Sequence, residues 1–203
     1  MIILESLLDK NADKDGLAQK LTTTDINLLT SLLDEKNDDI RYASFLVLKN
    51  RSEKYEDVYG HWDIFCEKLY SDNSYQRSIG IMLLAENIRW DKDNRFDDVV
   101  NDYLEHCKDE KFITSRQTIQ SIKVWIHERP DLRKQITDTL LAIDLNEFKE
   151  TQRKLILIDI LTVLIELQKV KSNERVSNYI NKAFTDGMLD KKAMKEIEKL
   201  IEE

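Results

Sequence analysis

Histidine and cysteine side chains occur in two pairs whose chemistry could hold a zinc ion. His61 lies five residues before Cys66, and His106 directly precedes Cys107. Two histidines and two cysteines form the ligand set of many structural zinc sites. Both pairs fall in segments with helical periodicity, where side chains on one face are three or four residues apart. Neither spacing meets that rule, so we expect buried, inert cysteines and no bound metal.

A second possible metal site lies near the amino terminus. Residues 11–16, N-A-D-K-D-G, reproduce positions 1, 3, 5 and 6 of the EF-hand calcium loop, including the glycine of its sharp turn. The twelfth position is Thr22, whereas the loop needs a bidentate Glu there. We interpret the segment from Asn11 to Gly16 as an Asp-rich connection between helices and leave cation binding there open.

Large aromatic side chains are the residues most able to anchor a protein partner. Trp90 begins the polar connection 90–96, where its other interpretation is a wedge between helix pairs. Trp125 lies close to His127 and Arg129, and packing in the core is its alternative interpretation. The candidate partner-binding residues are therefore Trp90, Trp125, His127 and Arg129.

Catalytic chemistry finds little support in the sequence. It contains no nucleophile elbow, phosphate-binding loop or His-Glu metal motif. Carboxylates are abundant but scattered, so no acid–base pair stands out. We therefore expect a protein with no catalytic residues and no cofactor.

The elements that would position these side chains follow from four arginines at nearly one pitch. Each arginine follows a polar turn and precedes an apolar run, and the separations are 36, 39 and 37 residues: Arg41, Arg77, Arg116 and Arg153. Repetition at this period is typical of stacked helix pairs. We interpret the arginines as structural, with a basic ladder for an anionic ligand as the alternative. The carboxylates expected to bind them lie six residues earlier: Glu35, Glu110 and Glu147.

Two irregularities interrupt this pattern. Asp159 lies inside the most apolar segment, 155–167, where an unpaired carboxylate would be costly, so we expect a hydrogen bond or ion pair between repeats. Its alternative is a role in ligand binding. When the third repeat is aligned with the others through Arg116, Gln120 and Ser121 fall at positions that are apolar in the other repeats. A shift of one residue instead places Ile119 and Ile122 at those positions. The register of the third repeat is therefore open.

Turn residues and helical periodicity predict a single all-α domain over residues 1–203. Its repeats are expected at about 1–50, 54–89, 95–128, 130–169 and 172–203. The expected helix caps are Thr24, Asp38 or Asp39, Thr114 or Ser115, Ser172 and Asp190, and Gly187 is expected to end a helix.

Composition limits the setting and the partners. Four Gly and one Pro in 203 residues favour helices over Gly-rich loops. The formal net charge of −8 argues against nucleic acid or an anionic membrane as partner. No basic flank precedes the apolar amino terminus, so we do not expect a secretory signal there. The most apolar segment, residues 155–167, is too short to span a bilayer. Two cysteines provide no disulfide framework, so we expect a reducing, cytoplasmic location.

Residues 32–48, L-L-D-E-K-N-D-D-I-R-Y-A-S-F-L-V-L, resemble the second half of a HEAT repeat. The resemblance covers roughly residues 24–168 and implies a right-handed α-solenoid of about five antiparallel helix pairs, of the HEAT/armadillo type. Residues 89–95, 114–122 and 129–136 are together similar to a family of small HEAT-repeat proteins of Firmicutes that has no established activity.

Three functions are compatible with these features. The first is a non-catalytic scaffold that binds a protein or peptide, neutral or basic to match the acidic chain. The second is an enzyme of the HEAT-like alkylpurine DNA glycosylase type, because residues 61–63, H-W-D, are similar to its Trp-Asp motif. Cys66 stands where that resemblance implies a further carboxylate. The third is self-assembly through an apolar stripe on the first or last helix, so the oligomeric state is open.

Overall fold

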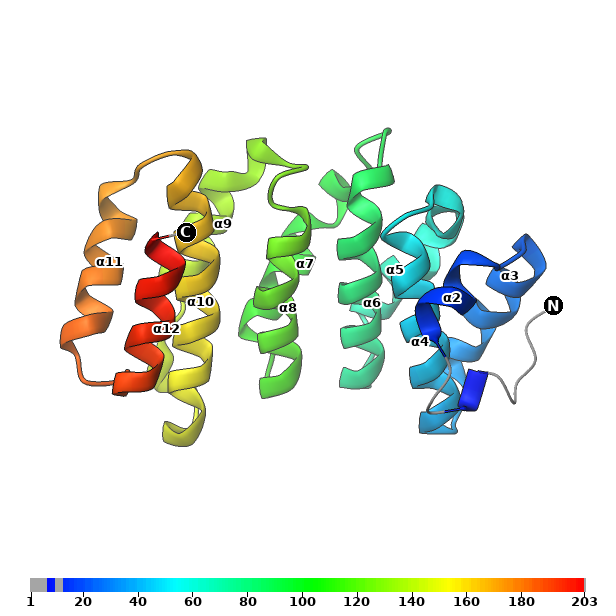
Figure 1. Cartoon of the computed structure of the whole chain (residues 1–203), viewed down its shortest axis with the longest axis horizontal. Coiled ribbons are helices and arrows are strands. Elements are labelled where there is room, and N and C mark those ends of the chain that lie inside the picture. Colours follow the sequence, from blue (N-terminus) through cyan, green and yellow to red (C-terminus); the bar gives the residue numbers. More distant parts are fainter. Residues whose placement is uncertain (1–6, 10–12, 203) are drawn as a thin grey trace. The chain divides into compact units, whose positions relative to one another are not determined.

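The computed structural model describes residues 7–9 and 13–202, and this part of the chain is all-helical (Figure 1). Eleven α-helices are joined by short 3-10 helices and turns, and the described residues contain no strand. The prediction of an all-α fold is confirmed. The helix expected over residues 1–10 lies mostly outside the described residues.

Two compact units divide the chain, residues 1–100 (unit 1) and residues 101–203 (unit 2). The boundary falls within the third predicted repeat, near the start of α7 (Val100–Glu105). Helices of the described structure begin or end within two residues of the predicted segment bounds, and the division into five repeats stays a prediction. A single continuous domain over residues 1–203 stays a prediction.

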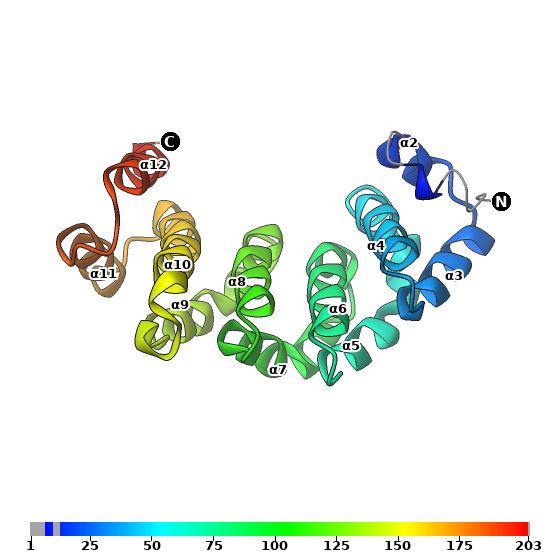
Figure 2. The same cartoon turned by 90° about the horizontal axis from the view of Figure 1, so that it is seen from below.

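Unit 1 consists of two rows of helices. Its α-helices are α2 (Lys14–Gln19), α3 (Thr23–Ser31), α4 (Asp38–Ser52), α5 (Trp62–Leu69) and α6 (Ser74–Asn87), with 3-10 helices at Leu32–Asp34, Glu56–His61, Ile88–Trp90 and Arg95–Asp98. Within this unit, α3 and α5 form one row, and α2, α4 and α6 form the other (Figure 2). Leu33, Leu48 and Phe65 are fully buried and belong to its core.

The helices α5 and α6 approach each other closely at Gly80. A Cβ atom at this position would lie 2.7 Å from the carbonyl oxygen of Phe65 and 2.8 Å from Cβ of Lys68. Both distances are shorter than van der Waals contact, so the observed separation of the two helices requires glycine.

Unit 2 is organised around its longest helix. Its α-helices are α7, α8 (Phe112–Trp125), α9 (Arg133–Leu141), α10 (Glu150–Val170), α11 (Glu174–Thr185) and α12 (Lys191–Glu202), with 3-10 helices at His106–Lys108, Pro130–Leu132 and Leu145–Glu147. Within this unit, α7, α9 and α11 form one row, and α8, α10 and α12 form the other (Figure 2). Since α10 contacts α8, α9, α11 and α12, its apolar residues Ile156, Ile160 and Leu164 are fully buried.

Several helices begin one or two residues away from the predicted caps. Asn37 caps α4 and Asn173 caps α11, where the sequence predicts Asp38 or Asp39 and Ser172. In each case the asparagine oxygen accepts two backbone N–H groups of the first turn. Adjacent polar residues compete for the cap, and the extended backbone of the asparagine decides between them.

Other helix ends show the same competition. Thr22 caps α3 in place of Thr24, because Thr22 and Asp25 each accept the other's backbone N–H in a capping box. Asp190 accepts two backbone N–H groups of α12, as predicted. Gly187, the predicted stop before α12, has a φ of 75°, which favours glycine.

Polar bonds between neighbouring helices recur at the predicted period in both units. In unit 1, Arg51 and Asn87 bind groups 33 and 35 residues away. In unit 2, Gln135, Lys154 and Arg175 bind groups 34, 36 and 37 residues away. Several hydrogen bonds within each unit therefore span nearly the period of the arginines, whereas those from Arg116 and Gln120 to Asp159 span 43 and 39 residues.

The third repeat differs from the others by one residue. The repeated arginine is the fourth residue of α4, α6 and α10, but Arg116 is the fifth residue of α8. One residue rotates a helical side chain by about 100°. Ile119 and Ile122 are fully buried and Gln120 is exposed, in agreement with the shifted alignment. Ser115 takes the fourth position, so the predicted cap at Thr114 or Ser115 is wrong, since both are buried inside α8.

Candidate partner-binding surfaces

Three of the repeated arginines connect each helix to the turn before it. Arg41, Arg77 and Arg153 donate hydrogen bonds of 2.8 to 3.1 Å to carbonyl oxygens five or six residues earlier. These carbonyls lie in or next to the preceding helix end, where intrahelical partners are missing. In α8, Ser115 takes this role, because its Oγ donates to the carbonyl oxygen of Cys107 at 2.7 Å. In the described structure, the carboxylates predicted to bind the arginines do not do so: Glu35, Glu110 and Glu147.

Arg116 instead binds a carboxylate of α10. Its Nε and Nη2 donate to Asp159 Oδ2 and Oδ1 at 2.6 and 3.1 Å. Gln120 Nε2 adds a bond of 2.8 Å to Oδ1. Asp159 is only 6% exposed, so these bonds compensate the burial of its charge, as the sequence predicts. The hydrogen bond to Asp159, although opposed by burial, raises the pKa of Arg116.

Trp125 is fully buried, which supports its interpretation as a core residue and not as a partner-binding residue. Its indole packs edge-to-face on Tyr103 at 5.8 Å, and Nε1 donates to the Tyr103 hydroxyl at 3.4 Å. The one-residue shift of α8 explains this burial. In the shifted alignment, Trp125 matches Arg51, Asn87 and Val163, all of which are buried.

The other predicted binding residues keep some exposure but are engaged within their own unit. Trp90 of unit 1 is half-buried, and its Nε1 donates at 2.7 Å to the last carbonyl oxygen of α4. Arg129 of unit 2 donates two hydrogen bonds to Asp131. His127 is exposed, and its Nε2 lies 3.3 Å from Glu166 Oε1. Of these three, only His127 presents most of its side chain to solvent.

The histidines and cysteines do not assemble a metal site. Within residues 7–9 and 13–202, no three His, Cys, Asp or Glu side chains lie close enough to hold a metal ion. Both cysteines are free. Burial and the charge of Asp63 raise the pKa of the Cys66 thiol to about 11. Burial and the charge of Glu105 raise the pKa of Cys107 to about 12.

We expect Cys66 to react slowly with iodoacetamide in the folded protein. The thiolate is the nucleophile, and a rise in pKa from 9.0 to about 11 lowers the thiolate fraction about 100-fold at mildly alkaline pH. Mass spectrometry of alkylated protein in buffer and in concentrated urea measures the two rates. Equal rates in the two solvents would show that the fold does not suppress ionisation of this thiol.

The calcium-like segment forms the start of a helix. Asp13 accepts the N–H of Gly16 and caps α2. Asp15 Oδ1 accepts a hydrogen bond of 2.6 Å from Asn50 Nδ2 on α4. Asn11 and Ala12 lie outside the described residues, so only residues 13–16 of the segment are placed. Both aspartates therefore have a structural role in unit 1, which favours the interpretation as a connection.

The residues that resemble a DNA glycosylase motif are engaged in contacts within unit 1. Trp62 is buried and packs against Phe96 at 6.4 Å. Asp63 forms an ion pair with Arg95. The described structure therefore gives this alternative no accessible aromatic ring at the motif.

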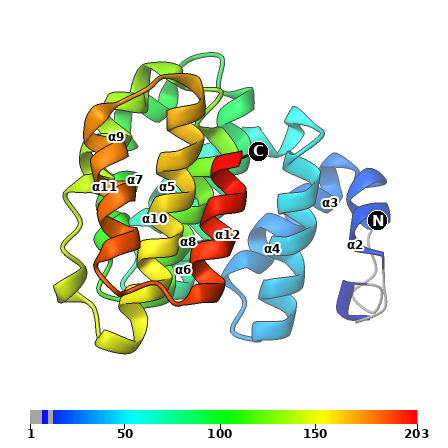
Figure 3. The same cartoon turned by 60° about the vertical axis from the view of Figure 1, so that its left-hand side comes forward.

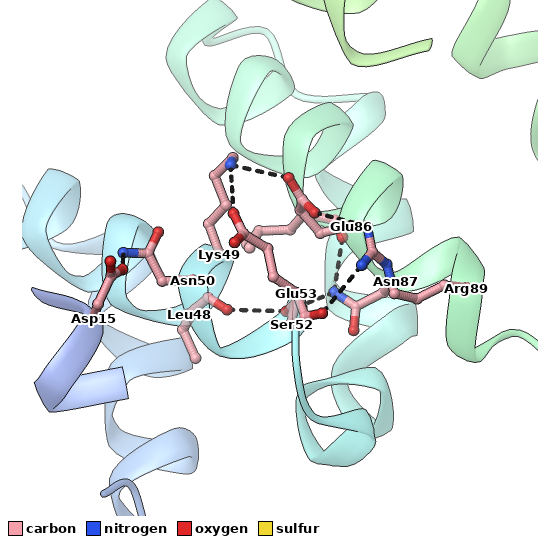
Figure 4. A network of polar contacts seen from close by, with 10 residues as sticks. Asp15, Leu48, Lys49, Asn50, Ser52, Glu53, Glu86, Asn87 and Arg89 are labelled. Atoms are coloured by element: carbon pink, nitrogen blue, oxygen red, sulfur yellow. Dashed lines mark hydrogen bonds and ion pairs between the residues drawn. The ribbon is translucent and has the colours of Figure 1, made fainter. Parts of the chain in front are cut away.

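A buried polar network fixes α4 against α6 (Figure 4). The carboxylate of Glu86 lies 2.9 Å from Lys49 Nζ and 3.5 Å from Arg89 Nη2, and it is almost inaccessible to solvent. Lys49 also lies 3.2 Å from Glu53. Burial disfavours the charged form of Lys49, but its bonds to Glu86 and Glu53 outweigh this and raise its pKa. The network holds the exposed faces of the two helices in one arrangement.

Three tyrosines on and beside these helices were not singled out from the sequence. Tyr42, Tyr70 and Tyr75 are 61%, 63% and 68% exposed, the highest values for large apolar or aromatic side chains among the described residues. Tyr42 lies in the second turn of α4, Tyr75 in the first turn of α6, and Tyr70 caps the end of α5. All three lie where α4 and α6 begin, and we call them the tyrosine surface. The Arg41 guanidinium lies 5.9 Å from the Tyr75 ring centre and links the two helices there.

Carboxylates accompany the tyrosine surface. Five lie in the turns before α4 and α6 or in the first turn of α4: Asp34, Glu35, Asp38, Asp39 and Asp72. Asp34 and Asp38 form ion pairs with Lys68 and Arg41, whereas the other three form none with a described residue. Residues 1–100 contain 20 acidic and 13 basic side chains, against 19 and 18 in residues 101–203. The negative charge of the chain is thus concentrated in unit 1.

Comparison with known proteins adds no assignment: no family model, curated protein or solved structure matches this chain. Among the described residues, no helix combines the length and apolar character needed to cross a membrane.

Proposed function

We propose that this chain is a HEAT-like α-solenoid that acts as a non-catalytic scaffold for a protein or peptide. The helices of each unit lie in two rows, and bonds between repeats recur at intervals of 33 to 37 residues. Both features support stacked helix pairs within each unit. That the stack is right-handed and extends over residues 1–203 as about five pairs is part of the proposal. The two features also support the resemblance to small bacterial HEAT-repeat proteins.

The tyrosine surface is the observation that carries the scaffold assignment. Tyrosine offers a large, rigid contact area at low entropic cost, and its ring attracts Lys and Arg side chains. Glu35, Asp39 and Asp72, in the turns before α4 and α6 or in the first turn of α4, form no ion pair with a described residue. The surface therefore suits a neutral or basic segment of polypeptide, whereas the phosphates of nucleic acid would be repelled.

The cellular setting that we propose is the bacterial cytoplasm. Cys66 and Cys107 are both free thiols, which a reducing compartment preserves. A scaffold of this kind needs no cofactor, and no catalytic group is part of the proposal.

Affinity capture from bacterial lysate tests the proposed function. We expect the wild type to retain polypeptides, and the Tyr42→Ala/Tyr75→Ala variant to retain them about tenfold more weakly, because two exposed anchors are lost. Both side chains are mostly exposed, so we expect the variant to keep its fold, which circular dichroism checks. Retention should also fall as salt is raised, because attraction between exposed charges is screened.

Ile113→Ala is the matched control, since it removes an exposed apolar side chain of unit 2. It should leave retention unchanged. Recovery of nucleic acid alone would refute the scaffold assignment. Equal recovery of polypeptides by the wild type and by the Tyr42→Ala/Tyr75→Ala variant would show that the tyrosine surface is not the binding site.

A further inference from the structure

A pocket of about 520 Å³ in unit 2 is lined by residues of α9, the carboxyl end of α10 and the amino end of α11. Figure 3 shows these three helices within unit 2. This volume is typical of small-molecule sites. Its charged lining residues are Asp131, Arg133, Lys134, Asp138, Lys171 and Arg175. Four cations thus share one pocket in a chain whose net charge is −8.

Cations already neutralise both carboxylates of this pocket. Asp138 Oδ2 accepts a hydrogen bond from Lys134 Nζ at 2.7 Å, and its Oδ1 accepts one from Arg175 Nη1 at 2.6 Å. These two bonds lower the pKa of Asp138. Asp131 accepts two hydrogen bonds from Arg129, and these lower its pKa. Both carboxylates remain ionised and paired near neutral pH, and neither is left to balance a further cation.

Arg133 and Lys171 are the cations without a counter-ion. Among the described residues, neither side chain forms a hydrogen bond or an ion pair. Arg133 is half-buried and Lys171 is exposed. The start of α11 adds little, because Asn173 Oδ1 already accepts the N–H groups of Arg175 and Val176. Arg133 and Lys171 therefore carry positive charge that no carboxylate of the described residues pairs, and Lys134 and Arg175 share the single negative charge of Asp138.

We propose that this pocket binds the phosphate group of a small organic phosphate. A phosphate monoester carries a charge of about −2 near neutral pH, which matches two unpaired cations. The guanidinium of Arg133 presents paired N–H donors that fit phosphate oxygens, and Lys171 adds a mobile ammonium group. Leu167 and Val176 line the same pocket and offer apolar contact to the organic part.

Isothermal titration calorimetry of the full chain tests the proposal, with glycerol phosphate, inorganic phosphate and glycerol as separate probes at constant ionic strength. We expect both phosphates to bind and glycerol not to bind. Tighter binding of glycerol phosphate would show that the organic part contributes, and equal binding would place recognition in the phosphate group. Both outcomes support the site, whereas no binding of either phosphate overturns it.

Three variants locate the binding in this pocket. Arg133→Gln/Lys171→Gln should weaken phosphate binding about tenfold or more, because charge-assisted hydrogen bonds are lost. Asp138→Asn should strengthen it, since Lys134 and Arg175 are then released from their carboxylate. Lys191→Gln removes an unpaired lysine from α12 and should have no effect. Unchanged affinity in the double variant, with folding verified by circular dichroism, overturns the proposal.

Discussion

Replacement of Trp125 by alanine is expected to lower the free energy of unfolding by about 3–5 kcal/mol. The side chain is fully buried, packs edge-to-face on Tyr103, and donates a hydrogen bond to the Tyr103 hydroxyl. Truncation would leave a cavity that surrounding helices fill only partly, and would remove an aromatic pair. Urea unfolding followed by circular dichroism measures the change.

Two further substitutions give this experiment its controls. Trp125→Phe keeps an aromatic ring against Tyr103 and loses the indole N–H, so a smaller loss of about 1–2 kcal/mol is expected. His127→Ala lies two residues further on at an exposed position and should change stability by less than about 0.5 kcal/mol. A similarly small effect of Trp125→Ala would show that this side chain is not buried and would contradict the described core of unit 2.

Arg116→Ala is expected to destabilise the protein by about 2–3 kcal/mol. It would leave the buried Asp159 carboxylate with only the hydrogen bond from Gln120. Loss of one partner from a buried ion pair costs about 3–5 kcal/mol. We place the expectation below that range because the Arg116 side chain is 25% exposed and part of its charge is solvated.

A double-mutant cycle measures the coupling free energy between Arg116 and Asp159 separately from their other contacts. Asp159→Asn removes the buried charge and keeps the volume, so Arg116→Ala should cost about 1–2 kcal/mol less in that background. Arg41→Ala is the comparison at a typical repeat, since Arg41 binds a carbonyl oxygen and the exposed Asp38. Its expected effect is below about 1 kcal/mol. Additive effects of Arg116→Ala and Asp159→Asn would show that the ion pair contributes no coupling.

Arg116 differs from the other three repeated arginines in its bonding partner. Arginine at the fourth position of α4, α6 and α10 reaches back to carbonyl groups left by the preceding turn. At the fifth position of α8, the same residue type points toward α10 and neutralises Asp159. Residue type and approximate period therefore predicted a structural role, but the bonding partner depended on a rotation of about 100°.

The same rotation explains why Trp125 lies in the core and not on a binding surface. Matching Arg116 to the other arginines puts Trp125 level with Asn50, Glu86 and Thr162, which are polar. Matching Ser115 instead puts it level with buried positions, including Asn87 and Val163. The signal was present in the sequence, because the shifted alignment also restores Ile119 and Ile122 to the core. The sequence alone left both registers open.

The tyrosine surface could not be predicted in the same way. Tyrosine occurs both in cores and on surfaces, as the buried Tyr103 and the exposed Tyr75 show in this chain. Tyr42, Tyr70 and Tyr75 also stand at unequal places in their repeats, so the period does not connect them. Their common location follows only from the packing of α4, α5 and α6.

Sequence by itself determined the helical class, the approximate ends of the helices and the need for Asp159 to be paired. These properties follow from local terms: apolar periodicity, polar caps, scarcity of Gly and Pro, and the cost of burying a charge. Tertiary structure decided which face of α8 is buried, which group each arginine binds, and where unpaired cations and exposed tyrosines gather. Those outcomes depend on one-residue shifts in helical register and on contacts between distant segments. A helix fixes the spacing of its own side chains but does not determine which neighbour each side chain contacts.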